Sequence, residues 1–485
     1  MNRSDGGGKG TGGGGVRGAA GGANLLALRS HNTALVLDLL RTAGTEGISR
    51  LELAERTGLT PQAVSKITGR LRGEGLATEA GRRASTGGKP RTVLRLVPGA
   101  GHALGVHLDR DELRAVLVDL DGTVVAERRA PLDLGAGAET VLAGVARSAE
   151  ELATEALRSP GAEGLLPPGA GGLRAAAAGG LRAAAADGPG SPTEDALRTS
   201  AAEGPGASAS KEQARGVRVP GEQVAGERVP GGRASGEGRE SPVAEGARSA
   251  GGALGAVPTL LGLGVALPGP LDHGRGVLHR VTGFPEWDGY PLRDALERRL
   301  GVPVVVDKDT NAAALGLAVR DGGGGGGAGG SFAYLHLGTG LGAGLVFGGG
   351  VHRGARTGAG EFGHQVLQLD GPPCTCGARG CVEALCLAAV ARGDLAEAAR
   401  VLGTGAANLA ALLDIDQVLL GGRTVAAAPE AFVHGVAAVL DARARREGGH
   451  DGAVPVRLAP GGTRAVAEGA AQLLLAPLFG RGDGD

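Results

Sequence analysis

The stretch from Leu337 to Glu383 decides the fold, and it reads LGTGLGAGLVFGGGVHRGARTGAGEFGHQVLQLDGPPCTCGARGCVE. It opens with a glycine-rich loop, residues 338–342, which directly follows the apolar run from Phe332 to Leu337. A strand that feeds such a loop presents backbone N–H groups with no side chains in the way, and this arrangement suits an anion. A plain turn is the alternative interpretation of the loop.

The second half of the stretch carries residue types that bind metals: His364, Cys374, Cys376 and Cys381. Cys374 and Cys376 are too close in sequence to form a disulfide easily, and Cys-Gly-x-x-Gly-Cys makes the tight knuckle that chelation needs. These residues predict a tetrahedral Cys3His zinc site, with a disulfide or buried free thiols as the alternative. All four cysteines lie between Cys374 and Cys386, which is typical of a metal cluster in a reducing compartment.

The motif Glu-x-Gly-His, followed by Cys-x-Cys-Gly-x-x-Gly-Cys-x-Glu, resembles the ROK family of sugar-responsive repressors and sugar kinases. The preceding LGTGLGAGL also matches that family. The resemblance implies a two-lobed, actin-like ATPase fold with a sugar held in the cleft. It also implies that the His and the three Cys residues hold a structural zinc ion. The implied sugar contacts are Glu361, His364 and Glu383, and the implied phosphate loop is Gly338, Thr339 and Gly340.

Composition limits the function classes. At 485 residues the chain can hold more than one domain. The net charge is −1, so a surface that binds nucleic acid has to be a local basic patch. No apolar run reaches the about 20 residues of a membrane span, and the N-terminus lacks the apolar region of a signal peptide. We therefore expect a cytoplasmic protein with no membrane partner.

Two segments have the composition of disordered chain. Residues 1–22 are rich in glycine, and residues 158–255 lack aromatic side chains and repeat the units GGLRAAAA and RVPG. Such segments cannot bury enough apolar surface to fold, so we expect a disordered tail and a disordered insertion. The predicted folded parts are a first domain, 23–98, and a second, kinase-like domain made of 101–157 and 256–480.

The first domain has the pattern of a winged helix-turn-helix. Ser49 is placed to cap a helix, with Glu52 at the capping-box position. Thr60 is placed to cap the next helix, which has Pro61 at its first position. Two short strands follow, and between them lies the basic loop GRRASTGGKPR, which we interpret as the wing. Two helices joined by a short turn, with a polar and basic exposed face, indicate a DNA-binding module.

Charge supports this interpretation. Between residues 61 and 95, eight Lys or Arg residues occur with two Glu, and such a local excess is the electrostatic footprint of DNA binding. The alternative is a solvated helical bundle used for protein contacts. The segment is also similar to the N-terminal domain of ROK repressors, whose wing usually contains Gly-Gly-Arg-Pro. The residues expected to contact DNA are Gln62, Ser65, Lys66, Arg70, Lys89 and Arg91.

The first hairpin of the second domain departs from the ROK kinases. In those kinases its turn holds Asp-x-Gly-Gly-Thr, which receives the ATP phosphates, and the matching positions here include His107, Asp109, Arg110 and Asp111. A triphosphate would be repelled by Asp109 and Asp111, and the missing glycines remove the close approach of the backbone. ATP is therefore not an expected cofactor. The expected cofactor is the zinc ion of the Cys3His site.

A second departure follows the strand at Val302–Val306. Asp309 matches the catalytic aspartate of the family, a general base for a sugar hydroxyl, with a helix N-cap as the alternative. Lys308 stands where the family has an Asn, and a Lys only donates and carries charge. Either the effector is acidic or phosphorylated, or Lys308 pairs with Asp309 or Glu361 and the pocket no longer binds a plain sugar.

Three hypotheses for function follow. The first is a sugar-responsive ROK repressor that binds a palindromic operator as a homodimer or homotetramer, with a kinase-like domain that no longer transfers phosphate. The second is an ATP-dependent sugar kinase, similar to glucokinase, with an added DNA-binding module; Asp309 and the loop at Gly338 favour it. The third is a scaffold that binds neither sugar nor ATP. An assay of ADP release over a panel of sugars distinguishes the first two.

Overall fold

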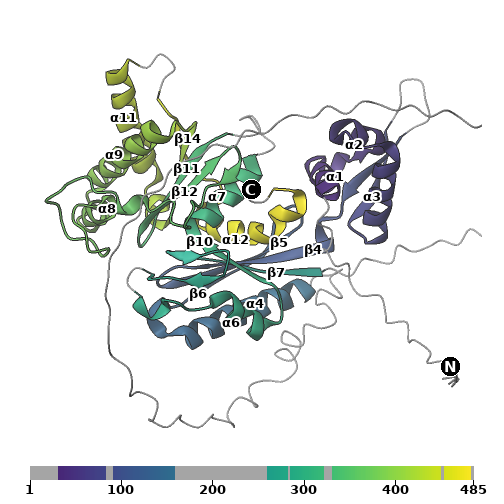
Figure 1. Cartoon of the computed structure of the whole chain (residues 1–485), viewed down its shortest axis with the longest axis horizontal. Helices are drawn as coiled ribbons and strands as arrows, with labels where there is room; N and C mark the ends of the chain where they lie inside the picture. The colour runs from purple at the N-terminus through teal and green to yellow at the C-terminus, as the bar shows by residue number, and fades with distance from the viewer. Residues whose placement is uncertain are drawn as a thin grey trace, which may run out of the picture. The chain divides into compact units, whose positions relative to one another are not determined.

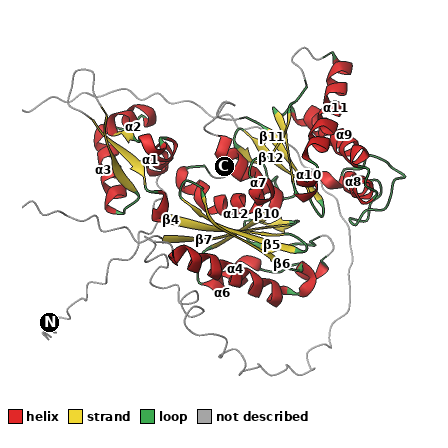
Figure 2. Cartoon of the chain, turned by 180° about the vertical axis from the view of Figure 1, so that it is seen from behind, coloured by secondary structure: helices red, strands yellow, loops and turns green. Residues whose placement is uncertain are grey.

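The computed structural model describes residues 31–83, 91–158, 259–281, 284–321, 330–448 and 453–481, and all of them belong to one compact unit. The predicted N-terminal tail, the predicted insertion beyond its first residue, and Lys89 of the predicted wing lie outside these ranges. Figures 1 and 2 show the described elements from opposite sides. Among them, no helix combines the length and the apolar character needed to cross a membrane.

The N-terminal domain is a winged helix, as predicted. It comprises α1 (His31–Thr42), β1 (Ile48–Ser49), α2 (Arg50–Thr57), α3 (Pro61–Gly73), β2 (Ala77–Arg83) and β3 (Arg91–Leu96), with the strands in the order β1-β3-β2. The predicted helix starts are confirmed: Ser49 and Glu52 form a capping box on α2, and the Thr60 side chain accepts from the amide of Ala63 on α3. These caps satisfy amides that a helix start leaves unpaired.

The first lobe of the second domain is built on a five-stranded sheet in the order β10-β7-β4-β5-β6. Strands β4, β5 and β6 form an antiparallel meander, and β7 and β10 add parallel to β4. Helices α4 and α6 cover the outer face (Figures 1 and 2). The bounds are β4 (Gly101–Leu108), β5 (Glu112–Asp119), β6 (Val124–Pro131), α4 (Ala138–Arg158), β7 (Thr259–Leu267), β8 (Leu271–Asp272), β9 (Val277–Leu278), α6 (Leu292–Leu300) and β10 (Val304–Lys308).

The second lobe repeats this plan with the strand order β13-β12-β11-β14-β15, an antiparallel meander to which two parallel strands are added. Helices α8, α9 and α11 lie on its outer side (Figure 1). The predicted two-lobed α/β fold is therefore confirmed. The bounds are β11 (Phe332–Leu337), β12 (Leu341–Phe347), β13 (Gly350–Val351), α8 (Val382–Ala391), α9 (Leu395–Leu413), β14 (Gln417–Gly421), α10 (Arg423–Ala427), α11 (Pro429–Glu447) and β15 (Val456–Leu458).

Helices α7 (Asp309–Asp321) and α12 (Ala465–Leu475) lie between the two sheets and pack on each other (Figure 1). Glycines allow this close packing. A Cβ added to Gly105 of β4 would come within 2.0 Å of a carbonyl oxygen of α12, and one added to Gly264 of β7 within 1.8 Å. No side chain could fit at such distances. The glycines at these positions therefore allow α12 to pack directly on the first sheet. Helix α7 then carries Asp309 to the edge where the two lobes meet.

The winged helix is joined to this helix pair. Val36, Leu37 and Leu40 of α1 share a core with Leu478 and Phe479, which follow α12. Nε and Nη2 of Arg481 donate to the two carboxylate oxygens of Asp38 on α1 at 2.9 and 3.0 Å. Nη1 of Arg481 donates to the carbonyl of Val319, in the last turn of α7, at 3.2 Å. One side chain thus links α1 to the helix that begins at Asp309.

Candidate functional site

A cavity of about 80 Å³ lies between the two lobes. It brings together residues that are far apart in sequence, because the first lobe supplies the ends of β4 and β10 and the second lobe supplies the loop after β11 and the start of α8. The three implied sugar contacts line it, together with the predicted base Asp309, the neighbouring Lys308 and two members of the predicted phosphate loop, while Gly338 is not among the lining residues. These lining residues are Lys308, Asp309, Glu361, His364, Glu383, Thr339 and Gly340.

The glycine-rich loop already uses part of its hydrogen-bonding capacity within the protein. Oε2 of Glu383, at the start of α8, accepts from the Leu341 amide at 2.8 Å, and the Gly338 amide donates to the Gly340 carbonyl at 2.9 Å. A Cβ on Gly340 would lie 3.0 Å from the same Glu383 oxygen, so the glycine permits this close approach. The buried Glu383 carboxylate thus sits on the loop, where a second anion would be repelled.

Lys308 is the least exposed charge of the cavity, with 4% of its side chain accessible. Its Nζ donates to Oε1 of Glu361 at 3.0 Å and to the carbonyl of Ala359. A buried ammonium group needs such partners because it has lost its water. Of the two pairings considered from the sequence, the structure contains the one with Glu361. Oε1 of Glu361 therefore already accepts a hydrogen bond from Lys308.

A buried ion pair fixes the end of β10, and the sequence analysis did not identify it. Asp307 accepts from Nε and Nη2 of Arg353 at 2.8 and 2.7 Å, and also from the side-chain amide of Asn311 at 3.0 Å. Arg353 follows β13 of the second lobe, so this pair links the lobes next to Lys308 and Asp309. Asp309 itself accepts from the Thr310 amide at 2.6 Å, whereas an N-cap accepts from an amide two or three positions further on.

A histidine pair lies at the wall of the cavity, which His336 lines. His107, at the end of β4, is 8% exposed, and its Nε2 has no hydrogen-bond partner among the described residues. Its ring packs edge-on against His336 at 6.1 Å, and His336 Nδ1 lies 2.9 Å from the Tyr334 hydroxyl. Burial lowers the pKa of His107 to about 4, although the nearby carboxylate of Asp309 acts in the opposite direction. His107 is therefore neutral at pH 7.

This burial predicts a pH dependence of stability. Between the ordinary pKa of 6.5 and the folded value of about 4, the unfolded chain binds a proton at His107 that the folded chain does not. Stability is thus lost as the pH falls through this window, by roughly 3 kcal/mol for a shift of this size. Urea unfolding at pH 7 and pH 4.5 should show a smaller loss for His107→Asn than for the wild type. Equal losses in the two proteins would contradict this explanation.

The predicted metal ligands come together in one cluster. His364, Cys374, Cys376 and Cys381 place their ligand atoms within 4.8 Å of one another. His364 Nδ1 lies 3.6 Å from Cys374 Sγ, and the sulfurs of Cys376 and Cys381 lie 3.8 Å apart. Zinc–sulfur bonds of about 2.3 Å in a tetrahedron also separate two sulfurs by about 3.8 Å. The cluster can therefore hold a tetrahedral metal ion, and His364 joins it to the cavity. The fourth cysteine, Cys386, instead donates to the Ala398 carbonyl.

Helix α3 presents the predicted DNA contacts on one face. Val64 and Leu71 are buried in the domain core, while Gln62, Ser65, Lys66 and Arg70 are exposed on the other side. Arg70 also has a structural partner, because its Nη2 donates to the Thr33 hydroxyl of α1 at 3.1 Å. Arg91 is exposed at the start of β3. The helix therefore offers a continuous polar face of the kind that enters a DNA groove.

Comparison with known proteins adds to this geometry. Residues 252–392 match the ROK family. The chain is 39% identical to glucokinase of Thermotoga maritima over 141 residues (28% of this chain, 42% of that protein) and 22% identical to the xylose repressor of Bacillus subtilis over 336 residues (69% and 61%). It is 37% identical to the DNA-binding transcriptional dual regulator NagC of Escherichia coli over 109 residues (22% and 26%). The chain thus spans less than two thirds of the length of each of these relatives.

A solved structure shares the fold over most of the chain. The crystal structure of a ROK family transcriptional regulator, a homologue of the E. coli MLC protein, superposes with a TM-score of 0.58 at 17% identity. The match covers 94% of this chain and 98% of that one. At this identity the likeness concerns the fold: a winged helix followed by a two-lobed domain.

Proposed function

The chain carries a ROK family domain over residues 252–392, and from this premise we propose that it is a sugar-responsive transcriptional repressor. The observation that carries the proposal is that one compact unit contains both a helix suited to DNA and a cleft suited to a sugar. An exposed polar helix suited to DNA and a cleft lined by carboxylates suited to sugar hydroxyls are joined through α1, Arg481 and α7. The homologous regions of a xylose repressor and of NagC support the same assignment.

The proposed mechanism is a coupling between cleft and DNA-binding domain. A sugar that engages Asp309, Glu361 and Glu383 would change the position of α7 relative to the second lobe, and the last turn of α7 contacts Arg481. Arg481 holds Asp38 of α1, so a shift there would alter the placement of α3. Two winged helices must match two half-sites, so a homodimer or homotetramer would lose operator affinity when their spacing changes.

We further propose that the metal is zinc and that its role is structural. Three thiolates and one imidazole form a closed ligand set, which leaves no open position for a reacting water. Zinc would fix the loop before α8 and orient His364, one of the proposed sugar contacts. Asp309, Lys308, Glu361, His364 and Glu383 are the proposed sugar-binding residues.

A kinase is the second candidate function, and Asp309 at the cavity favours it. A general base at this position could take the proton of a sugar hydroxyl while phosphate is transferred. Against it, Asp109 and Asp111 stand in the turn where phosphates would enter, and amides of the Gly338 loop are bonded within the protein. We therefore propose that ATP phosphotransfer has been lost.

The test compares DNA binding with ATP consumption. Purified full-length protein should bind fragments of its own promoter, as measured by fluorescence anisotropy, and xylose, glucose or N-acetylglucosamine should release one of these complexes. A coupled assay for ADP should show no turnover with the same sugars. Protein that ignores every DNA fragment but consumes ATP on a hexose, with activity lost in Asp309→Ala, would establish the kinase instead.

Lys308 provides a test of effector class. Replacing Lys308 by Asn should free Glu361 and restore a group that both donates to and accepts from a sugar hydroxyl. We expect calorimetry to show about tenfold tighter binding of a neutral sugar, equivalent to about 1.4 kcal/mol. Lys66→Asn is the matched control, because it removes the same charge from α3, away from the cleft. The opposite pattern, in which wild type binds a sugar acid and Lys308→Asn loses it, would identify an acidic effector.

A further inference from the structure

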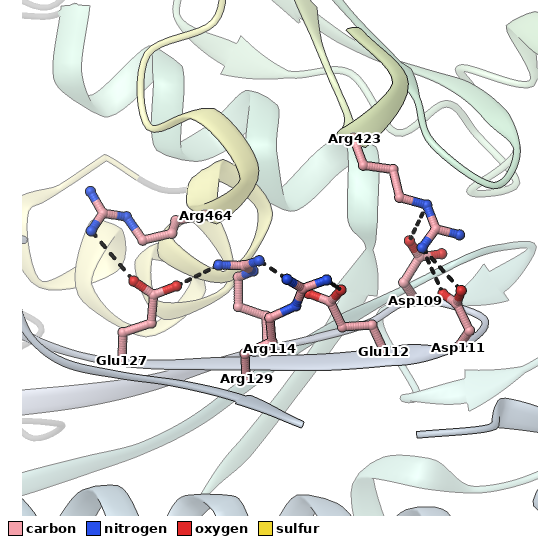
Figure 3. A network of polar contacts seen from close by, with 8 residues as sticks. All are labelled: Asp109, Asp111, Glu112, Arg114, Glu127, Arg129, Arg423 and Arg464. Atoms are coloured by element: carbon pink, nitrogen blue, oxygen red, sulfur yellow. Dashed lines mark hydrogen bonds and ion pairs between the residues drawn. The ribbon is translucent and has the colours of Figure 1, made fainter. Parts of the chain in front are cut away.

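Two acidic residues and one arginine face each other across the entrance of the cleft. Asp109 and Asp111 lie in the turn between β4 and β5 of the first lobe, and Arg423 is the first residue of α10 in the second lobe. Nη1 of Arg423 donates to the two oxygens of Asp111 at 2.9 and 3.1 Å, and its Nε lies 3.9 Å from Asp109. Figure 3 shows Arg423 reaching down to both carboxylates, apart from the ladder of ion pairs along β5 and β6.

Asp109 has a further partner in the second lobe. The hydroxyl of Thr339, in the glycine-rich loop, donates to Asp109 Oδ1 at 2.7 Å, and the Arg110 amide donates to the same oxygen at 2.8 Å. Burial alone would raise the pKa of Asp109, but His107, these two hydrogen bonds and Arg423 together hold it below the ordinary value. Asp109 is therefore charged at pH 7 and remains a strong acceptor for its partners.

These contacts satisfy polar groups that would otherwise face an open cleft. The turn of one lobe and the loop of the other are bonded to each other directly. The volume of the cavity, about 80 Å³, is also well below the roughly 300 Å³ at which small-molecule sites begin. A ligand of sugar size therefore requires the lobes to separate, and separation breaks these contacts together with the other interlobe pairs, Asp307 with Arg353 and Lys308 with Glu361.

We propose that Asp109, Asp111, Thr339 and Arg423 form an interlobe latch that holds the cleft closed in the absence of any ligand. The latch closes the domain through contacts between protein groups, and its opening admits the effector. Its ion pairs are partly exposed, with 40% of the Arg423 side chain and 62% of the Asp111 side chain accessible, so salt weakens it. The role of the latch in admitting an effector rests on the proposed function, but its test uses neither DNA nor sugar and can therefore fail or succeed independently.

The test is hydrogen–deuterium exchange of the ligand-free, full-length protein, read by mass spectrometry. Arg423→Gln and the double variant Asp109→Asn with Asp111→Asn should speed exchange in the segments 104–113 and 337–345 by about two- to fivefold, the range expected for a partly exposed ion pair. In the wild type, exchange in these segments should also become faster when KCl is raised from 0.05 to 0.5 M. In Arg423→Gln the increase should be smaller, because the ion pair is already absent.

Arg299→Gln is the matched control. Arg299 pairs with Glu139 at 2.6 Å with a similar arginine exposure, 36%, but it joins α6 to α4 within the first lobe. Exchange in the two cleft segments should remain as in wild type in this variant. The swapped pair, Asp111→Arg with Arg423→Asp, should restore slow exchange only in part, because the new carboxylate at position 423 also faces Asp109. Equal effects of Arg423→Gln and Arg299→Gln, or faster exchange spread over the whole chain including α9, would overturn the latch.

Discussion

Replacing Cys381 by serine is expected to abolish metal binding and to unfold the loop that connects His364 to α8. This loop buries little apolar surface of its own: Leu369 is 86% exposed and Val366 is 46% exposed. A segment with so small a core needs a cross-link to stay ordered. In zinc-finger peptides the metal supplies apparent binding energies of about 10–16 kcal/mol, and much of that energy is folding energy.

The consequence should reach the cleft. Cys381 is completely buried at the N-cap of α8, and Glu383, two residues later, accepts from the Leu341 amide of the glycine-rich loop. His364 lines the cavity and lies beside Cys374. If the cluster holds zinc as proposed, Cys381→Ser should lower the zinc content, the melting temperature and the affinity for sugar together. Metal analysis, calorimetry and thermal unfolding measure these three effects on one sample.

Cys386→Ser is the control for this experiment. It makes the same chemical change five residues later, at a buried thiol that donates to the Ala398 carbonyl and stands outside the metal cluster. Its zinc content should equal that of wild type, near one ion per chain. If the two serine variants retain equal amounts of zinc, or if wild-type protein purified without chelators contains none, the cluster is not a zinc site.

Much of the fold could be predicted from local sequence signals. The caps at Ser49 and Thr60 each act on an amide three residues away, so they could be predicted from the sequence. The apolar run from Phe332 to Leu337, expected as the strand before the glycine-rich loop, has the bounds of β11, because a run of apolar side chains is a local property. Helices α10 and α11 were not predicted, because apolar spacing is weak in an alanine-rich segment and tertiary packing, as at Phe432 and Val436, holds α11 in place.

Only those parts of the site that belong to a local sequence motif could be predicted. The spacing around His364 and Cys381 led to the metal cluster, which the structure assembles. The pairing of Lys308 with Glu361 was one of two options, since the sequence could not fix which carboxylate lies nearer. Arg423 was missed, although the acidic turn at Asp109 needed a cation. Arg423 and its partner Asp111 are more than 300 residues apart along the chain, and a pair so distant in sequence leaves no local pattern.

Substitutions on α3 should have the second large effect, a loss of DNA binding that differs between two side chains. Lys66 is exposed and forms no ion pair with any residue the structure describes, which suits a contact to a phosphate. Lys66→Ala should weaken binding to all DNA sequences and reduce the salt slope by about one. Gln62, near the start of the helix, is placed for a base edge, and Gln62→Ala should cost about 1–3 kcal/mol on the operator alone.

The two variants therefore separate positioning contacts from specificity contacts. Titrations by fluorescence anisotropy, on the operator and on unrelated duplex DNA at several salt concentrations, give both quantities. Arg400→Ala is a suitable control because Arg400 is an exposed arginine of α9 whose ion-pair partner, among the residues that the structure describes, is the nearby Glu397. Arg70→Ala is less informative, since it also removes the contact with Thr33 and so disturbs the packing of α1 on α3. If Gln62→Ala and Lys66→Ala leave operator binding as strong as Arg400→Ala does, α3 is not the helix that contacts DNA.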